Sequence, residues 1–371
     1  MWRYHNPVVV RFGWNALESL PELLGARDAV VITFPEAKQG GLEARLRALL
    51  GPRLRDVVSD VEPNPEVSWF RDRYEGFWKR HAGCALVAVG GGSAIDTAKL
   101  LQVATPEGSF AALFAALAAG RQPEVARAFP LIAIPTTAGT GSEVTPWATL
   151  WDRSSDVPRK HSLHVEEIWP ESALVDPSLT LSAPMAVTRN SALDALSHAL
   201  ESIWNVNSNP VSDTLAVEAA RTVIANLPGL LADPPDRALR TAMSRASLMA
   251  GLAFSNTRTA LAHSISYEMT LRHGLAHGLA CSFSLPLVWK LAAGADAARD
   301  AVLAQVFGDE AIPPWTRLAA FLEDVGVKTA FSAYGVDARE ARAMIEHALA
   351  GARGRNFVNP APRLDESIAR A

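Results

Sequence analysis

The sequence predicts an α/β domain with a parallel sheet over residues 1–184, followed by an all-helical domain over residues 185–371. Three observations support this organisation. Short apolar runs alternate with helical segments up to Pro184, helical spacing dominates after it, and 371 residues suit two domains better than one. The boundary is therefore expected at Pro184, where the pattern changes.

Three apolar runs in the first half predict buried parallel strands, at Ala29–Thr33, Leu86–Val89 and Leu131–Ile134. Continuous apolar runs bounded by turn residues are typical of parallel strands that are covered on both faces. Helical segments lie between them, at Gly41–Leu50 and Ala94–Val103. This alternation predicts a layered α/β domain.

The second half carries apolar residues at three- and four-residue spacings, which is the pattern of helices with one buried face. The clearest segments are Ser191–Ile203, Pro210–Asn226, Arg237–Ala253 and Asp296–Phe307. These segments predict an all-α domain.

Composition excludes several classes of partner. Hydrophobic residues at 49% and charged residues at 20% indicate a globular protein with a large core, and a net charge of −4 provides no basic field for nucleic acid. No uncharged run reaches the ~20 apolar residues of a membrane span, and the first residues lack the apolar stretch of a signal peptide. Cys84 and Cys281 lie far apart in apolar runs, which favours free thiols over a disulfide and suits a cytoplasmic location.

Two polar, glycine-rich loops follow predicted strands. Gly90–Gly92 lack a Cβ, so a pyrophosphate can approach the backbone, and a helix starting near Ser93 directs N–H groups toward the anion. The second loop, Pro135–Thr145, follows the next strand, and ligands of open α/β sheets bind at the carboxyl ends of strands. A plain glycine turn is the alternative for the first loop taken alone, but two such loops after different strands predict a nucleotide site.

Four side chains in the helical half form a candidate metal site. Asp194 and His198 are spaced i, i+4, which places a carboxylate and an imidazole on one helix face. His263 and His277 follow in apolar surroundings. A single helix histidine is usually a core or surface residue, but one carboxylate with three imidazoles predicts a site for Fe²⁺ or Zn²⁺.

Four motifs occur in order: GGGSAIDTAK at residues 90–99, PTTAGTGSEVT at 135–145, DALSH at 194–198, and the pair His263 and His277-Gly. With these motifs the sequence resembles the iron-containing (group III) alcohol dehydrogenase family over roughly residues 7–360. The resemblance implies a dehydroquinate synthase-like fold, with a dinucleotide-binding domain, a helical metal-binding domain and a cleft between them. It also implies reversible hydride transfer between a small alcohol or aldehyde and NAD(P)H, in a homodimer or larger assembly.

Carried over from the family motifs, the metal ligands are Asp194, His198, His263 and His277. The cofactor contacts are Gly91, Gly92, Ser93, Asp96, Thr136, Thr137, Thr140 and Lys160. Many relatives carry a further histidine four residues after the third ligand, where this chain has Tyr267. Tyr267 or His273 is therefore the candidate proton relay.

Coenzyme preference depends on the end of the first predicted strand. Relatives that prefer NAD often carry an acid there, whereas this chain has Phe34 with Lys38 nearby. Loss of the acid removes repulsion against a 2′-phosphate, so we expect NADPH to be accepted, although Glu36 could restore a preference for NAD.

The substrate prediction depends on basic groups. Arg258, Arg272 and His161 suit a dianionic aldehyde, because the fork of an arginine matches phosphonate or carboxylate oxygens. The alternative is that these arginines pair with surface acids. The sequences at residues 262–267, 145–149 and 201–204 resemble the phosphonoacetaldehyde reductase branch, which implies reduction of phosphonoacetaldehyde to 2-hydroxyethylphosphonate.

Other functions remain open at this stage. Maleylacetate reductases share the fold and can lack part of the metal set, and glycerol dehydrogenase-like and dehydroquinate synthase-like proteins share the architecture. A protein without catalysis, such as an inactive nucleotide-binding subunit, would bind nucleotide and show no metal-dependent turnover.

Overall fold

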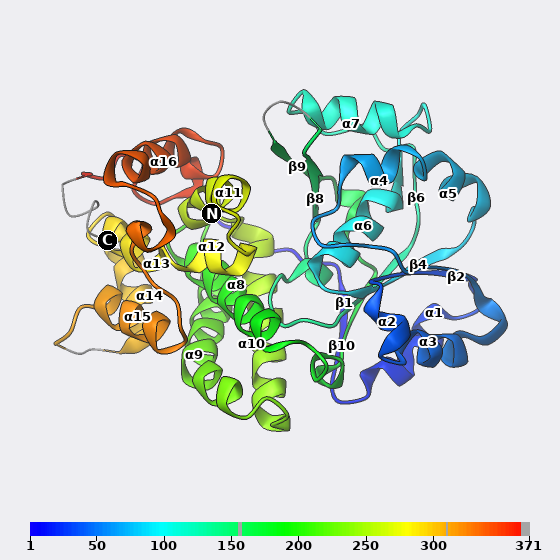
Figure 1. Ribbon diagram of the computed structural model, residues 1–371, viewed down its shortest axis with the longest axis horizontal. Coiled ribbons are helices and arrows are strands. Elements are labelled where there is room, and N and C mark those ends of the chain that lie inside the picture. The colour runs from blue at the N-terminus through cyan, green and yellow to red at the C-terminus, as the bar shows by residue number, and fades with distance from the viewer. Residues whose placement is uncertain (155–157, 309–310, 365–371) are drawn as a thin grey trace. The chain divides into compact units, whose positions relative to one another are not determined.

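The computed structural model describes residues 1–154, 158–308 and 311–364, and the chain divides into two compact units (Figure 1). The sheet unit comprises residues 7–137 and 142–182. The helical unit comprises residues 1–6, 138–141 and the chain from residue 183 onward. The sequence analysis expected one boundary, at Pro184. In the structure two short segments of the first half, residues 1–6 and 138–141, also belong to the helical unit.

A six-stranded parallel sheet forms the centre of the sheet unit. Its strands are β1 (Val9–Phe12), β2 (Ala29–Thr33), β3 (Leu54–Val58), β4 (Ala85–Gly90), β7 (Leu131–Pro135) and β10 (Ser172–Val175). Their order across the sheet is β1-β10-β7-β4-β2-β3, and each neighbouring pair is parallel. The predicted parallel α/β architecture is confirmed, and the three strands predicted from apolar runs are β2, β4 and β7.

Helices cover both faces of this sheet. One set is α1 (Leu20–Leu24), α2 (Glu36–Gln39) and α3 (Leu42–Leu50), and the other is α4 (Val67–Arg71), α5 (Tyr74–Arg80), α6 (Gly92–Gln102) and α7 (Phe110–Ala118) (Figure 1). In β2, Val30 and Ile32 join the apolar core with α4–α7, while Ala29 and Val31 join the core with α1 and α3. Because successive strand residues face opposite sides, an all-apolar strand fills two cores.

Two short antiparallel pairs accompany the main sheet: β5 (Val103–Ala104) with β6 (Arg127–Ala128), and β8 (Trp147–Asp152) with β9 (Arg159–His164). Sequence patterning did not predict β9, because its residues are mostly polar. It forms a strand through its pairing with the more apolar β8, which outweighs a weak local preference.

The helical unit contains α8 (Met185–Ile203), α9 (Pro210–Ala232), α10 (Arg237–Thr257), α11 (Leu261–His273), α12 (His277–Ser282), α13 (Leu285–Ala292), α14 (Ala297–Phe307), α15 (Pro314–Asp324) and α16 (Ala338–Ala350). Helices α8, α9 and α10 pack against one another around one apolar core. The predicted all-helical character is confirmed. Helix α8 begins at Met185 and not at Ser191 as predicted. The spacing of apolar residues did not reveal its first turn, because the residues there are mostly exposed.

Side chains define the starts of the long helices. Asn209 accepts hydrogen bonds from the amides of Val211 and Ser212 and forms a capping box at α9, and Asp236 accepts one from Leu239 at α10. Among the described helices, α9 is the one long and apolar enough to cross a membrane. It packs against α8 and α10 within the core, as core helices of the same composition do.

Candidate metal and cofactor sites

Helix α8 places Asp194 and His198 on its buried face, at 3% and 5% exposure. His198 Nε2 lies 3.8 Å from Asp194 Oδ1. The ring of Phe254, from α10, stacks on the His198 ring with centroids 4.1 Å apart, and the carbonyl oxygen of Gly139 lies 3.4 Å from His198 Nδ1. These contacts hold the imidazole with its Nε2 toward the carboxylate.

Helices α11 and α12 bring two more imidazoles to the same carboxylate oxygen. His263 Nε2 lies 3.5 Å and His277 Nε2 lies 3.8 Å from Asp194 Oδ1. The rings of His198 and His263 are stacked with centroids 4.6 Å apart. The structure therefore brings together the four side chains that the sequence proposed as ligands.

A close approach of two helices positions His277. The next residue is Gly278, and a Cβ at this position would lie 1.8 Å from the carbonyl oxygen of Asn190 in α8. Only glycine permits this separation. Ser197 Oγ, also in α8, donates a 2.6 Å hydrogen bond to the carbonyl oxygen of Cys281, which ties α12 to the same helix.

Glu201 orients His263, and the sequence analysis missed it. Its Oε2 lies 2.5 Å from His263 Nδ1, and its Oε1 accepts hydrogen bonds from the amides of Ala262 (2.5 Å) and His263 (3.2 Å). Glu201 is fully buried, which opposes its charge, but His263 lowers its pKa, so it accepts from His263 Nδ1–H and leaves Nε2 as the ring nitrogen that faces Asp194 and is free to bind a metal once deprotonated. Glu201 is spaced i+3 from His198 in an apolar helix, which is the signal that could have identified it.

Two buried atoms in this cluster lack a hydrogen-bond partner within the described part of the chain: Asp194 Oδ1 and His263 Nε2. Buried polar atoms normally have hydrogen-bond partners, so two such atoms without partners, 3.5 Å apart, indicate a position where a ligand binds. A cation between them satisfies both, because each has a lone pair to donate.

The protonation states in the cluster follow from burial and charge. Burial opposes the charge on Asp194, but His198, His277 and His263 outweigh it and hold the pKa of Asp194 below its usual range. Burial lowers the pKa of His198 to about 4. Burial also acts against a charge on His263, but Cys281, Glu201 and Asp194 raise the pKa of His263 well above its ordinary value. The acidic surroundings thus favour a positive charge next to Asp194, which a proton on His263 supplies in the metal-free cluster and which a bound cation would supply in place of that proton.

The two glycine-rich loops meet in the sheet unit. Helix α6 begins at Gly92, directly after β4, and a Cβ on Gly90 would lie 2.6 Å from Ala94 Cβ. The amide of Thr136, at the end of β7, donates a 3.0 Å hydrogen bond to the carbonyl oxygen of Gly90, and a Cβ on Gly91 would lie 3.3 Å from Thr137 Oγ1. The backbones of both loops therefore meet at the start of one helix.

Ser93 and Asp96 already have partners in this arrangement. Ser93 Oγ accepts a 3.1 Å hydrogen bond from the amide of Asn64. Asp96 Oδ1 accepts one from Ser142 Oγ at 2.6 Å, and its Oδ2 accepts one from the amide of Thr149 at 2.9 Å. Asp96 therefore ties α6 to the second loop, and burial raises the pKa of its carboxyl group.

Lys99 is fully buried and fastens the same loop. Its Nζ donates to the carbonyl oxygens of Ser142, Thr145 and Trp147 at 2.5, 2.7 and 2.9 Å. Burial lowers the pKa of Lys99 to about 8 and raises the pKa of Glu143, in the short 3₁₀ helix Ser142–Val144, to about 7. Asp96 and Lys99, from the motif at residues 90–99, thus hold the second loop in place through hydrogen bonds.

Two further cofactor candidates lie in different units. Lys160, on β9, places its ammonium 5.0 Å from the centre of the Trp151 ring. Thr140 belongs to the short segment of residues 138–141 within the helical unit. His161, beside Lys160 on β9, meets the ring of Phe114 edge-on with centroids 5.5 Å apart.

Three of the four candidate substrate and proton-relay residues of the helical unit contact other side chains. Arg272 forms a 3.1 Å ion pair with Glu268 and is 63% exposed, which is the surface pairing left open as an alternative. His273 Nε2 lies 3.2 Å from Glu340 Oε1. The Tyr267 ring lies under the guanidinium of Arg353, 4.7 Å from ring centre to Cζ. Arg258 is exposed at the end of α10.

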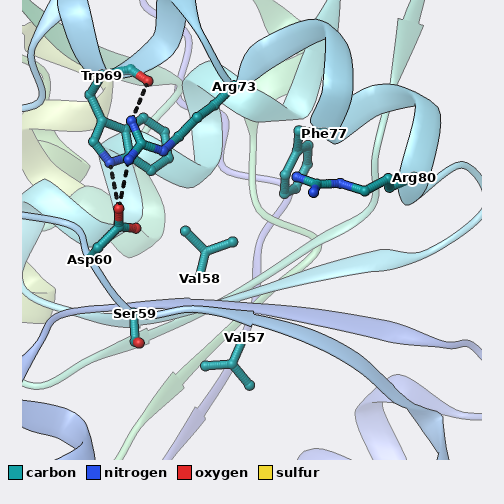
Figure 2. Close-up of a pocket in the computed structure, with 8 residues that line it drawn as sticks. All are labelled: Val57, Val58, Ser59, Asp60, Trp69, Arg73, Phe77 and Arg80. Carbon is teal, nitrogen blue, oxygen red and sulfur yellow. Dashed lines mark hydrogen bonds and ion pairs between the residues drawn. The ribbon is translucent and has the colours of Figure 1, made fainter.

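A separate hollow of about 310 Å³ lies beside the edge strand β3 of the sheet unit (Figure 2). Figure 2 shows Arg73 over the Trp69 ring, with both side chains donating hydrogen bonds to Asp60. None of the site residues predicted from sequence lines it. The remaining lining residues are Val57, Val58, Ser59, Phe77 and Arg80.

Comparison with known proteins matches both halves of the chain to one family. Residues 7–177 match the family model described as iron-containing alcohol dehydrogenase, and residues 188–370 match the model of the C-terminal domain of the Fe-containing alcohol dehydrogenase family. The chain is 32% identical to 1,3-propanediol dehydrogenase of Citrobacter freundii, with 100% of this chain and 97% of that protein covered. It is 35% identical to long-chain-alcohol dehydrogenase 1 of Geobacillus thermodenitrificans, with 76% and 71% covered.

A similar solved structure is sulfoacetaldehyde reductase from Bifidobacterium kashiwanohense in complex with NAD⁺. The TM-score is 0.87 at 28% identity, and the match covers 100% of this chain and 97% of that one.

Proposed function

This chain belongs to the iron-containing alcohol dehydrogenase family, and from that membership we propose that Asp194, His198, His263 and His277 hold the metal of its active site. Membership confirms the resemblance seen in the sequence motifs and the fold. The protein is an oxidoreductase acting on the CH–OH group of an alcohol or the carbonyl of an aldehyde, with NAD(P) and iron as cofactors.

One observation carries the assignment of the ligands: Asp194 Oδ1 and His263 Nε2 are buried without partners, at the point where two further imidazoles converge. One oxygen and three nitrogen donors suit Fe²⁺ or Zn²⁺. When bound, such a metal polarises a carbonyl oxygen, and NAD(P)H supplies the hydride.

The residues of this chain position and protect that chemistry. Glu201 fixes the tautomer of His263, and Phe254 fixes the ring of His198. The side chains of Asp194, His198 and His263 are 7% exposed or less, whereas His277 is 32% exposed. Substrate therefore reaches the site from the side of His277, while the other three donors stay shielded from water.

The proposed contacts of NAD(P)H lie mainly on the two glycine-rich loops that follow β4 and β7. The amides of Gly91, Gly92 and Ser93 start α6, and their N–H groups suit a pyrophosphate. The other proposed contacts are Asp96, Thr136, Thr137, Thr140 and Lys160. Phe34 follows β2, and its ring lies 3.2 Å from a Cβ placed on Gly90. Because Phe34 offers no carboxylate to a ribose, NADPH is accepted as well as NADH.

The proposed substrate is a small aldehyde with a phosphonate or sulfonate group. A similar structure is a sulfoacetaldehyde reductase, and sulfonate and phosphonate share the oxygen geometry that an arginine recognises. Arg258, Arg272 and His161 are the proposed contacts, with phosphonoacetaldehyde as the first compound to test. Tyr267 or His273 is the proposed proton relay. The protein is further proposed to be a cytoplasmic homo-oligomer.

A substrate panel tests this function. Protein loaded separately with Fe²⁺ and Zn²⁺ is assayed with NADH and NADPH on phosphonoacetaldehyde, sulfoacetaldehyde and uncharged aldehydes. We expect metal-dependent oxidation of either coenzyme, fastest with an anionic aldehyde. Turnover on uncharged aldehydes alone would exclude the anionic substrate, and unchanged turnover in His277→Ala would exclude its role as a ligand.

A further inference from the structure

A fifth donor lies within the cluster of proposed ligands. Cys281 follows His277 by one turn of α12, so the two side chains share a helix face. The ligand atoms of Asp194, His263, His277 and Cys281 all lie within 4.8 Å of one another. Cys281 Sγ is 3.5 Å from His277 Nδ1 and 3.6 Å from His277 Nε2.

The surroundings of Cys281 differ from those of the other cysteine. Both are buried free thiols. Cys84 belongs to the apolar core of the sheet unit, which is the usual environment of a structural thiol. Cys281 is fully buried but is not part of the apolar core that contains its neighbours Ala280 and Phe283. Its sulfur faces a carboxylate and two imidazoles instead.

The orphaned atoms provide an independent indication of a ligand at this position. Asp194 Oδ1 and His263 Nε2, on side chains 3% and 4% exposed, have no hydrogen-bond partner and belong to the same group of four as the sulfur. We propose that Cys281 supplies a thiolate ligand to the metal held by Asp194, His198, His263 and His277. This inference rests on the proposed metal site and adds a donor to it.

Metal binding by Cys281 releases one proton. The thiol releases its proton to solvent, and the sulfur lone pair forms the bond to the cation. Sulfur together with imidazole and carboxylate suits Zn²⁺, Co²⁺ and Fe²⁺ better than Mg²⁺ or Mn²⁺, because thiolates are soft donors. The site is therefore expected to discriminate against these harder cations, and the Cys281→Ser variant loses part of that discrimination.

Cobalt substitution tests the sulfur ligand without relying on activity. Co²⁺ is added to metal-free wild-type protein and to the variants Cys281→Ser and Cys84→Ala. Visible d–d absorption reports binding, and a sulfur-to-cobalt charge-transfer band in the near ultraviolet reports ligation by sulfur. We expect the band in the wild type and in Cys84→Ala, and its loss in Cys281→Ser while Co²⁺ still binds.

The outcomes separate this inference from the proposed function. Bound Co²⁺ without the charge-transfer band in the wild type overturns the sulfur ligand and leaves the metal site intact. Failure of the wild type to bind Co²⁺ overturns the metal site itself. If Cys281→Ser does not fold, X-ray absorption of the Zn²⁺-loaded wild type decides. A sulfur neighbour at about 2.3 Å supports the ligand, and a shell of only nitrogen and oxygen overturns it.

Discussion

Replacing Glu201 with glutamine is expected to weaken metal binding without removing any proposed ligand. The Glu201 carboxylate satisfies three buried donors: the amides of Ala262 and His263 on one oxygen, and His263 Nδ1–H on the other. Glutamine keeps the shape of the side chain but offers one acceptor oxygen and an NH₂ group. At least one donor must then face another donor.

The size of the effect follows from the two possible orientations of the amide. If the glutamine oxygen faces the backbone amides, its NH₂ group forces His263 Nδ1 to accept, so the proton moves to Nε2 and blocks the metal. If the oxygen faces Nδ1, the buried amides of Ala262 and His263 lose their acceptor. Metal binding requires the second arrangement, and if this lies about 1–3 kcal/mol above the first, the dissociation constant rises roughly 5- to 150-fold. Removal of partners behind metal-bound histidines typically costs 10–100-fold.

The measurement is a competition titration of Zn²⁺ between the protein and a chromophoric chelator. Glu218→Gln is the matched control, because Glu218 is a 46% exposed carboxylate paired with Arg245 at 3.5 Å, and we expect its affinity to be unchanged. Thermal unfolding of the metal-free proteins verifies that both variants fold. Wild-type affinity in a folded Glu201→Gln protein would refute the argument that Glu201 sets the tautomer of His263.

Three further predictions concern the loops and helix contacts. Burial raises the pKa of Glu143 to about 7, so the folded state keeps a proton that the unfolded state loses between pH 4.5 and 7. The free energy of unfolding that Glu143 contributes to the wild type therefore falls as the pH rises through that window. The free energy of unfolding of Glu143→Gln minus that of the wild type should rise by about 3 kcal/mol from pH 4.5 to 7, measured by urea unfolding at several pH values. A difference independent of pH would contradict it. Lys99→Met leaves three loop carbonyl oxygens without their buried donor, so it should lower the free energy of unfolding by about 3–5 kcal/mol. A loss below ~1 kcal/mol in the same assay would show that the loop does not need the Lys99 ammonium. Gly278→Ala sets a methyl group against the carbonyl oxygen of Asn190 and should cost about 3 kcal/mol or more, and an unchanged melting temperature would disprove this close approach.

Local sequence was sufficient for three of the six strands of the main sheet, for several of the long helices and for the type of sheet. The runs that became β2, β4 and β7 were recognisable because parallel strands covered on both faces must be apolar throughout. The long helices were recognisable by their spacing, but α8 was predicted to start too late because an exposed first turn carries no apolar signal. The polar strand β9 was missed because its pairing with β8 is not encoded in its own pattern.

Asp194 and His198 could be placed on one face from sequence alone, since helix geometry fixes the positions of residues four apart. Only the tertiary structure shows that Glu201 turns toward His263 and that Cys281 lies among the same side chains, because both contacts depend on how α8, α11 and α12 pack. The roles of Lys99 and Glu143 in the second loop likewise arise from folding across two strands. Local composition determines which elements form, whereas the partners of a buried polar group are set by chain segments distant in sequence.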